Sequence, residues 1–120
     1  MSAQSLKDDH RISPRKKIRT RVVFEDENNE EFLYFLSTDI SIAGIFIESR
    51  IPLLNHTKVF LKFSLYEGDD PIQVTGEIMR LAEGKRGRGR RPKKQKIGIG
   101  IRFLELSTTQ LKKIQDFIVS

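Results

Sequence analysis

The sequence Asp39-Ile40-Ser41-Ile42-Ala43-Gly44 separates two apolar runs, Phe-Leu-Tyr-Phe-Leu at 32–36 and Ile-Phe-Ile at 45–47. A polar turn between two short apolar runs is typical of neighbouring antiparallel strands. Gly44 can adopt positive φ, and its missing side chain leaves room for another backbone or for a ligand. The stretch therefore predicts a strand on each side of a tight turn.

The same turn carries polar groups that suit a ligand. Residues two apart in an extended segment point to the same side, so Asp39 and Ser41 can face one molecule together. The carboxylate accepts hydrogen bonds, whereas the hydroxyl donates and accepts. Such a pair suits the N–H groups at the edge of a guanine base. The alternative is a turn in which both side chains bond to their own backbone.

Six short apolar or alternating segments predict six strands, at 19–24, 31–38, 45–48, 58–65, 72–81 and 97–103. In a chain of 120 residues, this pattern predicts a mostly β domain, built as a small antiparallel barrel or sandwich. Gly76 is expected to mark a bulge or bend.

The end of the chain has a helical pattern. Ser107 and Gln110 form a capping box. An apolar stripe at helical spacing follows, and we expect it to pack on the barrel rather than to bind a partner. The stripe consists of Leu111, Ile114, Phe117 and Ile118.

Composition limits the protein class. The chain has no cysteine, which excludes disulfides, thiolate chemistry and cysteine-based metal sites. No run approaches the roughly 20 apolar residues of a transmembrane helix, and the polar N-terminus lacks a secretory signal pattern. We expect a cytoplasmic protein without a transmembrane segment.

Positive charge is concentrated in two places. Residues 84–96 contain eight of the 22 basic residues and no acidic residue. Removing these eight charges from the net charge of +6 leaves −2. Seven of the other basic residues lie between Lys7 and Arg21.

The first basic cluster contains Arg11 and Arg15 around Pro14, which disfavours a helix through Ser13. Guanidinium groups bind phosphates and the O6/N7 edge of guanine through paired hydrogen bonds, and they stack on bases. An arm with two arginines can therefore grip one nucleotide from two sides. The alternative is a solvated basic arm that contacts nothing.

Together, Arg11-Ile-Ser-Pro-Arg15 and Asp39-Ile-Ser41-Ile-Ala-Gly44 resemble the R-x-x-x-R and D/N-x-S-x-x-G motifs of the PilZ family of cyclic di-GMP receptors. The final strand and the turn into the helix, 97–107, are also similar to that family. The resemblance implies a six-stranded antiparallel β-barrel with a C-terminal helix and no catalysis or cofactor. It implies that Arg11, Arg15, Asp39, Ser41 and Gly44 form the cyclic di-GMP site.

The arm also departs from the family pattern. Many relatives have a further arginine where this chain has His10, which leaves the number of bound nucleotides open. By spacing alone, Arg15 and Arg19 form an alternative pair. Pro14 favours Arg11 and Arg15, so His10 and Arg19 are additional candidate ligand residues.

The basic segment 84–96 resembles an AT-hook, a reader of the DNA minor groove, although Arg91 interrupts the motif before Pro92. The alternatives are an acidic protein partner, a membrane surface or a solvated loop. The candidate contact residues are Lys85, Arg86, Arg88, Arg90, Arg91, Lys93, Lys94 and Lys96.

We therefore predict a tail at 1–8 and one domain at 9–118 that includes the basic loop. A binding module is favoured over an enzyme, because neither His10 nor His56 has a pattern that brings it to a nucleophile. The predicted function is a cyclic di-GMP receptor that orders its arginine arm and signals to an unknown protein partner. Two alternatives are a cyclic di-GMP-controlled nucleic-acid-binding protein and an adaptor that binds no nucleotide.

Overall fold

The computed structural model describes residues 14–80 and 96–120. The predicted tail (1–8), His10, Arg11 and the basic segment up to residue 95 lie outside the described residues. Within the described part of the chain, no helix is long and apolar enough to cross a membrane.

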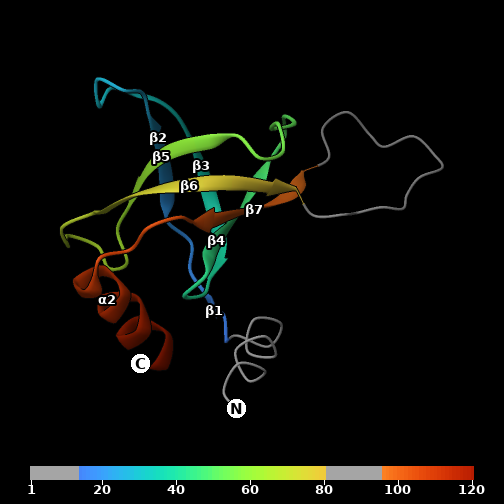
Figure 1. Cartoon of the computed structure of the whole chain (residues 1–120). Coiled ribbons are helices and arrows are strands. Elements are labelled where there is room, and N and C mark those ends of the chain that lie inside the picture. The colour runs from blue at the N-terminus through green and yellow to red at the C-terminus, as the bar shows by residue number, and fades with distance from the viewer. Residues whose placement is uncertain (1–13, 81–95) are drawn as a thin grey trace, which may run out of the picture.

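The described residues form seven strands and one helix (Figure 1). They are β1 (Lys16–Lys17), β2 (Arg21–Glu25), β3 (Glu31–Ile40), β4 (Gly44–Ser49), β5 (Lys58–Phe63), β6 (Ile72–Arg80), β7 (Ile97–Phe103) and α2 (Thr108–Val119). Six of the strands lie side by side in the order β3-β2-β5-β6-β7-β4, and each pair is antiparallel. The pairing of β4 with β3 closes the sheet. The predicted six-stranded barrel with a C-terminal helix is confirmed.

Alternate side chains of the strands fill the barrel. Burying a large aliphatic or aromatic side chain contributes about 1.5–3 kcal/mol relative to leaving it exposed. The buried residues include Val22, Phe24, Phe35, Ile45, Ile47, Leu61, Phe63, Ile78, Ile99 and Ile101. These inward positions fix which residues of the same strands face outward.

Helix α2 lies across one end of the barrel (Figure 1). The predicted capping box is present, since Ser107 Oγ accepts from the Gln110 N–H and Gln110 Oε1 accepts from the Ser107 N–H, both at 3.0 Å. Ile114 and Phe117 are buried in the core cluster. The stripe is therefore part of the core, as predicted.

Several predicted boundaries differ from the structure. The first long strand begins at Arg21 rather than at 19, and the strand predicted at 58–65 ends at Phe63. Gly76 shows no bulge, because it pairs in register with Val59 and with Phe103. A Cβ at Gly76 would lie 2.6 Å from the Ile101 side chain, so the glycine serves close packing.

The sequence did not predict β1. β1 pairs with the end of β3, where Lys16 lies opposite Ile40 and Lys17 lies opposite Asp39. β2 pairs with the same edge of β3, nearer to the start of that strand. The buried Ser37 of β3 lies beside the residues that connect β1 to β2. Its hydroxyl donates to the Ile18 carbonyl and accepts from the Thr20 N–H at 2.9 Å. These bonds attach the segment after Arg15 to the barrel wall.

Gly44 begins β4 at the place where the strand packs most closely against β7. A Cβ at this position would lie 2.3 Å from the Ile101 carbonyl oxygen and 3.1 Å from Arg102 Cα. Gly44 is not among the glycines with positive φ. The close approach of another backbone, rather than a special backbone angle, therefore requires glycine here.

We expect Gly44→Ala to lower the free energy of unfolding by about 1–3 kcal/mol, because the Ile101 carbonyl cannot retreat without disturbing the β4–β7 pairing. Urea unfolding measures the change. Gly100→Ala is the control, since its Cβ would meet the Phe46 ring at 3.1 Å and a side chain can rotate away. A Gly44→Ala midpoint equal to that of the parent would contradict this role.

Candidate functional site

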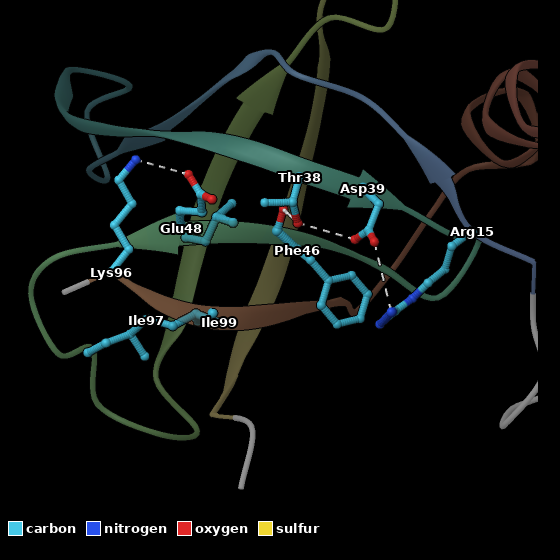
Figure 2. A pocket seen from close by; sticks show the side chains of 10 residues that line it. Arg15, Thr38, Asp39, Phe46, Glu48, Lys96, Ile97 and Ile99 are labelled. Atoms are coloured by element: carbon cyan, nitrogen blue, oxygen red, sulfur yellow. Dashed lines mark hydrogen bonds and ion pairs between the residues drawn. The ribbon is translucent and has the colours of Figure 1, made fainter. Parts of the chain in front are cut away.

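Arg15 and Asp39 come together on the outside of the barrel, at the end of β3 (Figure 2). Arg15 directly precedes β1, and β1 pairs Lys17 with Asp39, so the backbone register brings the two side chains to one place. Arg15 Nη1 lies 3.9 Å from Asp39 Oδ2, and the two side chains are 47% and 24% exposed. Residues that are 24 positions apart in the sequence thus share one surface.

Phe46 provides an aromatic surface beneath this ion pair. The Arg15 guanidinium carbon lies 3.8 Å from the centre of the Phe46 ring. Phe46 faces outward because its neighbours Ile45 and Ile47 are buried in the barrel. A cation, a carboxylate and an aromatic face therefore meet at one point.

A pocket of about 290 Å³ extends from this point over β3, β4 and β7. Gly100 lies opposite Phe46 in the register, and Gly98 lies opposite Glu48. Gly98 lines the pocket, whereas the Phe46 ring packs over Gly100, where a Cβ would lie only 3.1 Å from the ring. The lining residues are Arg15, Thr38, Asp39, Phe46, Ile47, Glu48, Lys96, Ile97, Gly98 and Ile99.

Glu48 and Lys96 form the other end of the pocket (Figure 2). Lys96 Nζ lies 3.4 Å from Glu48 Oε1, and the side chains are 46% and 32% exposed. Lys96 is the last residue of the basic segment and directly precedes β7. The sequence predicts a separate site for this segment, whereas the structure places its last residue in the same pocket as Arg15.

Ser41 and Gly44 do not line the pocket. Ser41 is buried, its Oγ accepts from the Ala43 N–H at 3.1 Å, and its N–H donates to the Gly44 carbonyl at 2.9 Å. Ser41 thus adopts the alternative arrangement, in which the side chain bonds to its own turn. Asp39 differs, since its carboxylate faces Arg15 and its Oδ1 lies 3.3 Å from Thr38 Oγ1.

The structure brings together Arg15 and Asp39 from the predicted set. Arg19 is exposed in the interval between β1 and β2 and does not line the pocket. Sequence reasoning missed Phe46 and Glu48. Once Ile45 and Ile47 are known to be buried, positions 46 and 48 must lie on the other face of β4. The three apolar residues at 45–47 do not show this alternation in the sequence.

Two other charged clusters lie outside the pocket. Hydrogen bonds from His56 first and Arg102 second lower the pKa of the Glu77 carboxyl. Hydrogen bonding to Glu31 raises the pKa of Lys62, with a further contribution from Glu25. The Arg102–Glu77 and Lys62–Glu25 pairs connect neighbouring strands. His56 belongs to the cluster around Glu77 rather than to the pocket.

The pocket has the chemistry of a binding site for a flat, anionic molecule. Phe46 offers a stacking face, Arg15 and Lys96 offer cations, and Asp39 accepts N–H groups. In residues 14–80 and 96–120, no cluster of three or more histidine or carboxylate groups could hold a metal ion. No histidine is among the described residues that line the pocket.

Comparisons with known proteins place the chain in a family. No curated protein matches it by sequence. The solved structures with a similar fold include three that this chain covers over most of its own length. The Bacillus subtilis inhibitor of motility (MotI/DgrA) matches with a TM-score of 0.67 and 17% identity over 89% of this chain and 48% of the other. This chain thus spans about half the length of that structure.

The other two structures are single PilZ domains. The PilZ domain of YcgR from Escherichia coli, solved with c-di-GMP, matches with a TM-score of 0.61 and 18% identity over 88% of this chain and 86% of the other. The PilZ domain of CeSA from a cellulose-synthesizing bacterium matches with a TM-score of 0.56 and 10% identity, covering 89% and 96%. The PilZ domain family model matches residues 9–120. The chain belongs to the PilZ domain family.

Proposed function

We propose that this PilZ domain is a cyclic di-GMP receptor that passes the binding signal to a protein partner. The observation that carries the proposal is the meeting of Arg15 with Asp39 at the edge of a pocket. It joins one residue from each of the two sequence motifs at one surface. The family membership and the ligand of the YcgR domain support the same nucleotide.

The proposed contacts follow from the chemistry of the ligand. Cyclic di-GMP has two phosphates, which accept from arginine, and two guanines, whose N1–H and amino groups donate to a carboxylate. Arg15 and Arg11 would hold a phosphate or the O6/N7 edge of a guanine through paired hydrogen bonds. Asp39 would accept from the donor edge of one guanine, as its outward position allows.

Phe46 and Ser41 have supporting roles in this proposal. A guanine can join the stack that the Phe46 ring and the Arg15 guanidinium already form. Ser41 Oγ already accepts from the Ala43 N–H, so the hydroxyl proton is the group that it can offer to a ligand. Gly44 acts indirectly, by letting β4 pack against β7 beneath the turn.

Binding is proposed without catalysis. Hydrolysis of a phosphodiester needs an activated nucleophile with a base in hydrogen-bond reach, or a metal ion that supplies it. The described lining of the pocket contains neither a histidine nor a metal-binding cluster. The groups that are present can hold a nucleotide, and a receptor needs no more.

We expect the domain to bind cyclic di-GMP at micromolar or tighter affinity. Hydrogen bonds to charged groups contribute about 1.5–3 kcal/mol each, so Arg15→Ala and Arg11→Ala should each weaken binding at least roughly 100-fold when a paired contact is lost. Asp39→Ala and Ser41→Ala should cost about 1–3 kcal/mol each. Isothermal titration calorimetry measures all four variants.

Arg19→Ala is the matched control, because it removes an exposed arginine of the same segment that does not line the pocket. It should keep the parent affinity. Loss of binding in Arg19→Ala, with binding retained in Arg11→Ala, would show that the arginine pair is Arg15 and Arg19. Absence of binding heat and of a thermal shift with millimolar ligand would exclude the proposed function.

Ordering of the arginine arm is the second part of the proposal. Residues 16–17 already pair with β3 in this structure, so the ordering is proposed for residues 9–15. Hydrogen exchange at those amides should slow when cyclic di-GMP is added, because ligand phosphates neutralise the arginines and hold the arm against β3. Exchange in the barrel core should change little. Unchanged exchange at 9–15 under saturating ligand would exclude the ordering and leave the binding intact.

The far end of the pocket gives a further prediction. The Glu48 carboxylate repels ligand phosphates, and Lys96 offsets that charge. Exposed charge pairs contribute about 0.2–1 kcal/mol, so Glu48→Gln should tighten binding and Lys96→Ala should weaken it, each by a factor of roughly 1.4 to 5. Lys112→Ala is the control, since it removes the same charge from α2, where Lys112 pairs with Asp116. Equal affinities for Lys96→Ala and Lys112→Ala would place Lys96 outside the site.

A further inference from the structure

We propose that Lys16 is a positioning residue that couples the ligand site to the C-terminal end of α2. The coupling rests on the proposed binding of cyclic di-GMP at Arg15. Lys16 itself does not touch the pocket. It acts through the short segment that it shares with Arg15.

The half-buried Lys16 makes an extensive contact with the helix. Lys16 Nζ donates to the Phe117 carbonyl at 3.2 Å, to the Ser120 carbonyl at 3.0 Å and to Ser120 Oγ at 2.8 Å. The same ammonium group lies 4.9 Å from the centre of the Phe117 ring. These bonds join residues that are more than 100 positions apart in the chain.

A cation stabilises the C-terminal end of a helix such as α2. The last carbonyl groups of a helix have no partner within it, and they carry the negative end of the helix dipole. The last turn of α2 contains no basic residue of its own. Ser120 already donates to the Phe117 carbonyl through its N–H at 3.2 Å and through its Oγ at 2.7 Å. Lys16 therefore adds a further donor at this end of α2 and supplies the positive charge.

Arg15 and Lys16 are adjacent, and neighbouring side chains in an extended segment point to opposite sides. Arg15 turns to Asp39 and Phe46, while Lys16 turns to Phe117 and the end of α2. The backbone between these contacts is held against β3 by the pairing of Lys16 with Ile40. The two adjacent residues Arg15 and Lys16 thus carry the proposed ligand contact on one side and a helix cap on the other.

Phe117 connects the cap to the core. Phe117 is buried and belongs to the core cluster, and its ring packs edge-on against Tyr66 with the ring centres 5.5 Å apart. A ligand that fixes Arg15 reduces the freedom of β1 and strengthens the cap. Linkage requires the reverse effect to be equal, so the cap must strengthen ligand binding by the same factor.

Three variants test the coupling. Lys16→Met keeps the apolar stem and removes the donor and the charge, and Lys16→Arg keeps both. Lys17→Met is the matched control, because Lys17 is the next residue of the same strand, is exposed and makes no side-chain hydrogen bond or ion pair with another described residue. Its side chain lies on the side of Arg15, opposite Asp39. Its loss therefore weakens the attraction of an anionic ligand at least as much as the loss of the Lys16 charge does. Both methionine variants lower the net charge by the same amount.

The measurements are hydrogen exchange at residues 116–120 and calorimetric affinity for cyclic di-GMP. In the parent and in Lys17→Met, saturating ligand should slow exchange at 116–120 by roughly two- to fivefold. In Lys16→Met without ligand, exchange at residues 116–120 should be faster than in the parent. Adding ligand to this variant should not change that exchange. The affinity of Lys16→Met for cyclic di-GMP should be lower than that of Lys17→Met, by the same factor by which ligand slows exchange in the parent. Lys16→Arg should restore the parent's exchange at 116–120 and the parent's affinity.

Three outcomes separate the claims. Identical exchange and affinity for Lys16→Met and Lys17→Met would overturn the coupling. Faster exchange in Lys16→Met with an affinity equal to that of Lys17→Met would also overturn it, and would leave Lys16 as a helix cap only. A parent protein that binds no cyclic di-GMP would overturn the proposed function and the coupling with it, while the exchange measured without ligand would still decide whether Lys16 caps α2.

Discussion

The pairing of β3 with β4 closes the barrel, and the site depends on it. The two strands are joined by a three-residue turn, which the Ser41 N–H closes by donating to the Gly44 carbonyl. Gly44 then lets β4 approach the Ile101 carbonyl of β7 more closely than any side chain would permit. This geometry leaves Asp39 at the outer end of β3 and places Phe46 beside it.

The stretch from Asp39 to Gly44 therefore serves two purposes. Ser41 and Gly44 shape the turn and the strand packing, whereas Asp39 presents its carboxylate to the pocket. Because both purposes are met within six residues, a substitution at Ser41 or Gly44 can weaken binding by moving Asp39. Measuring the free energy of unfolding together with the ligand affinity separates a disturbed turn from a lost ligand contact.

The sequence predicted the barrel and the helix because the buried positions recur with clear periods. Each of the six predicted segments became a strand, and Ser107 begins the capping box of α2. The sequence did not predict β1, since a two-residue strand has no period to recognise. Phe46 was missed for a related reason. In Ile45-Phe46-Ile47 all three residues are apolar, so the pattern hides which one faces outward.

The contact between Arg15 and Asp39 was suggested by the family resemblance rather than by the pattern of residues. It depends on the pairing of β1 with β3, which joins distant parts of the chain and leaves no local signal. Gly44 was expected to allow an unusual backbone angle or a close approach, and the close approach is what the structure uses. Lys96 was assigned to a separate basic segment, because sequence distance concealed that β7 begins beside β4.

The resting position of Arg15 is compatible with tight ligand binding. An exposed ion pair such as that with Asp39 contributes about 0–1 kcal/mol, and an exposed cation–π contact contributes about 0.5–1 kcal/mol. A ligand that redirects Arg15 therefore gives up less than about 2 kcal/mol. Each new hydrogen bond between a guanidinium and a phosphate contributes about 1.5–3 kcal/mol in return. Holding Arg15 at the pocket edge also limits the side-chain entropy that remains to be lost on binding. Contacts that are weak individually can thus place the arginine without competing strongly with the ligand.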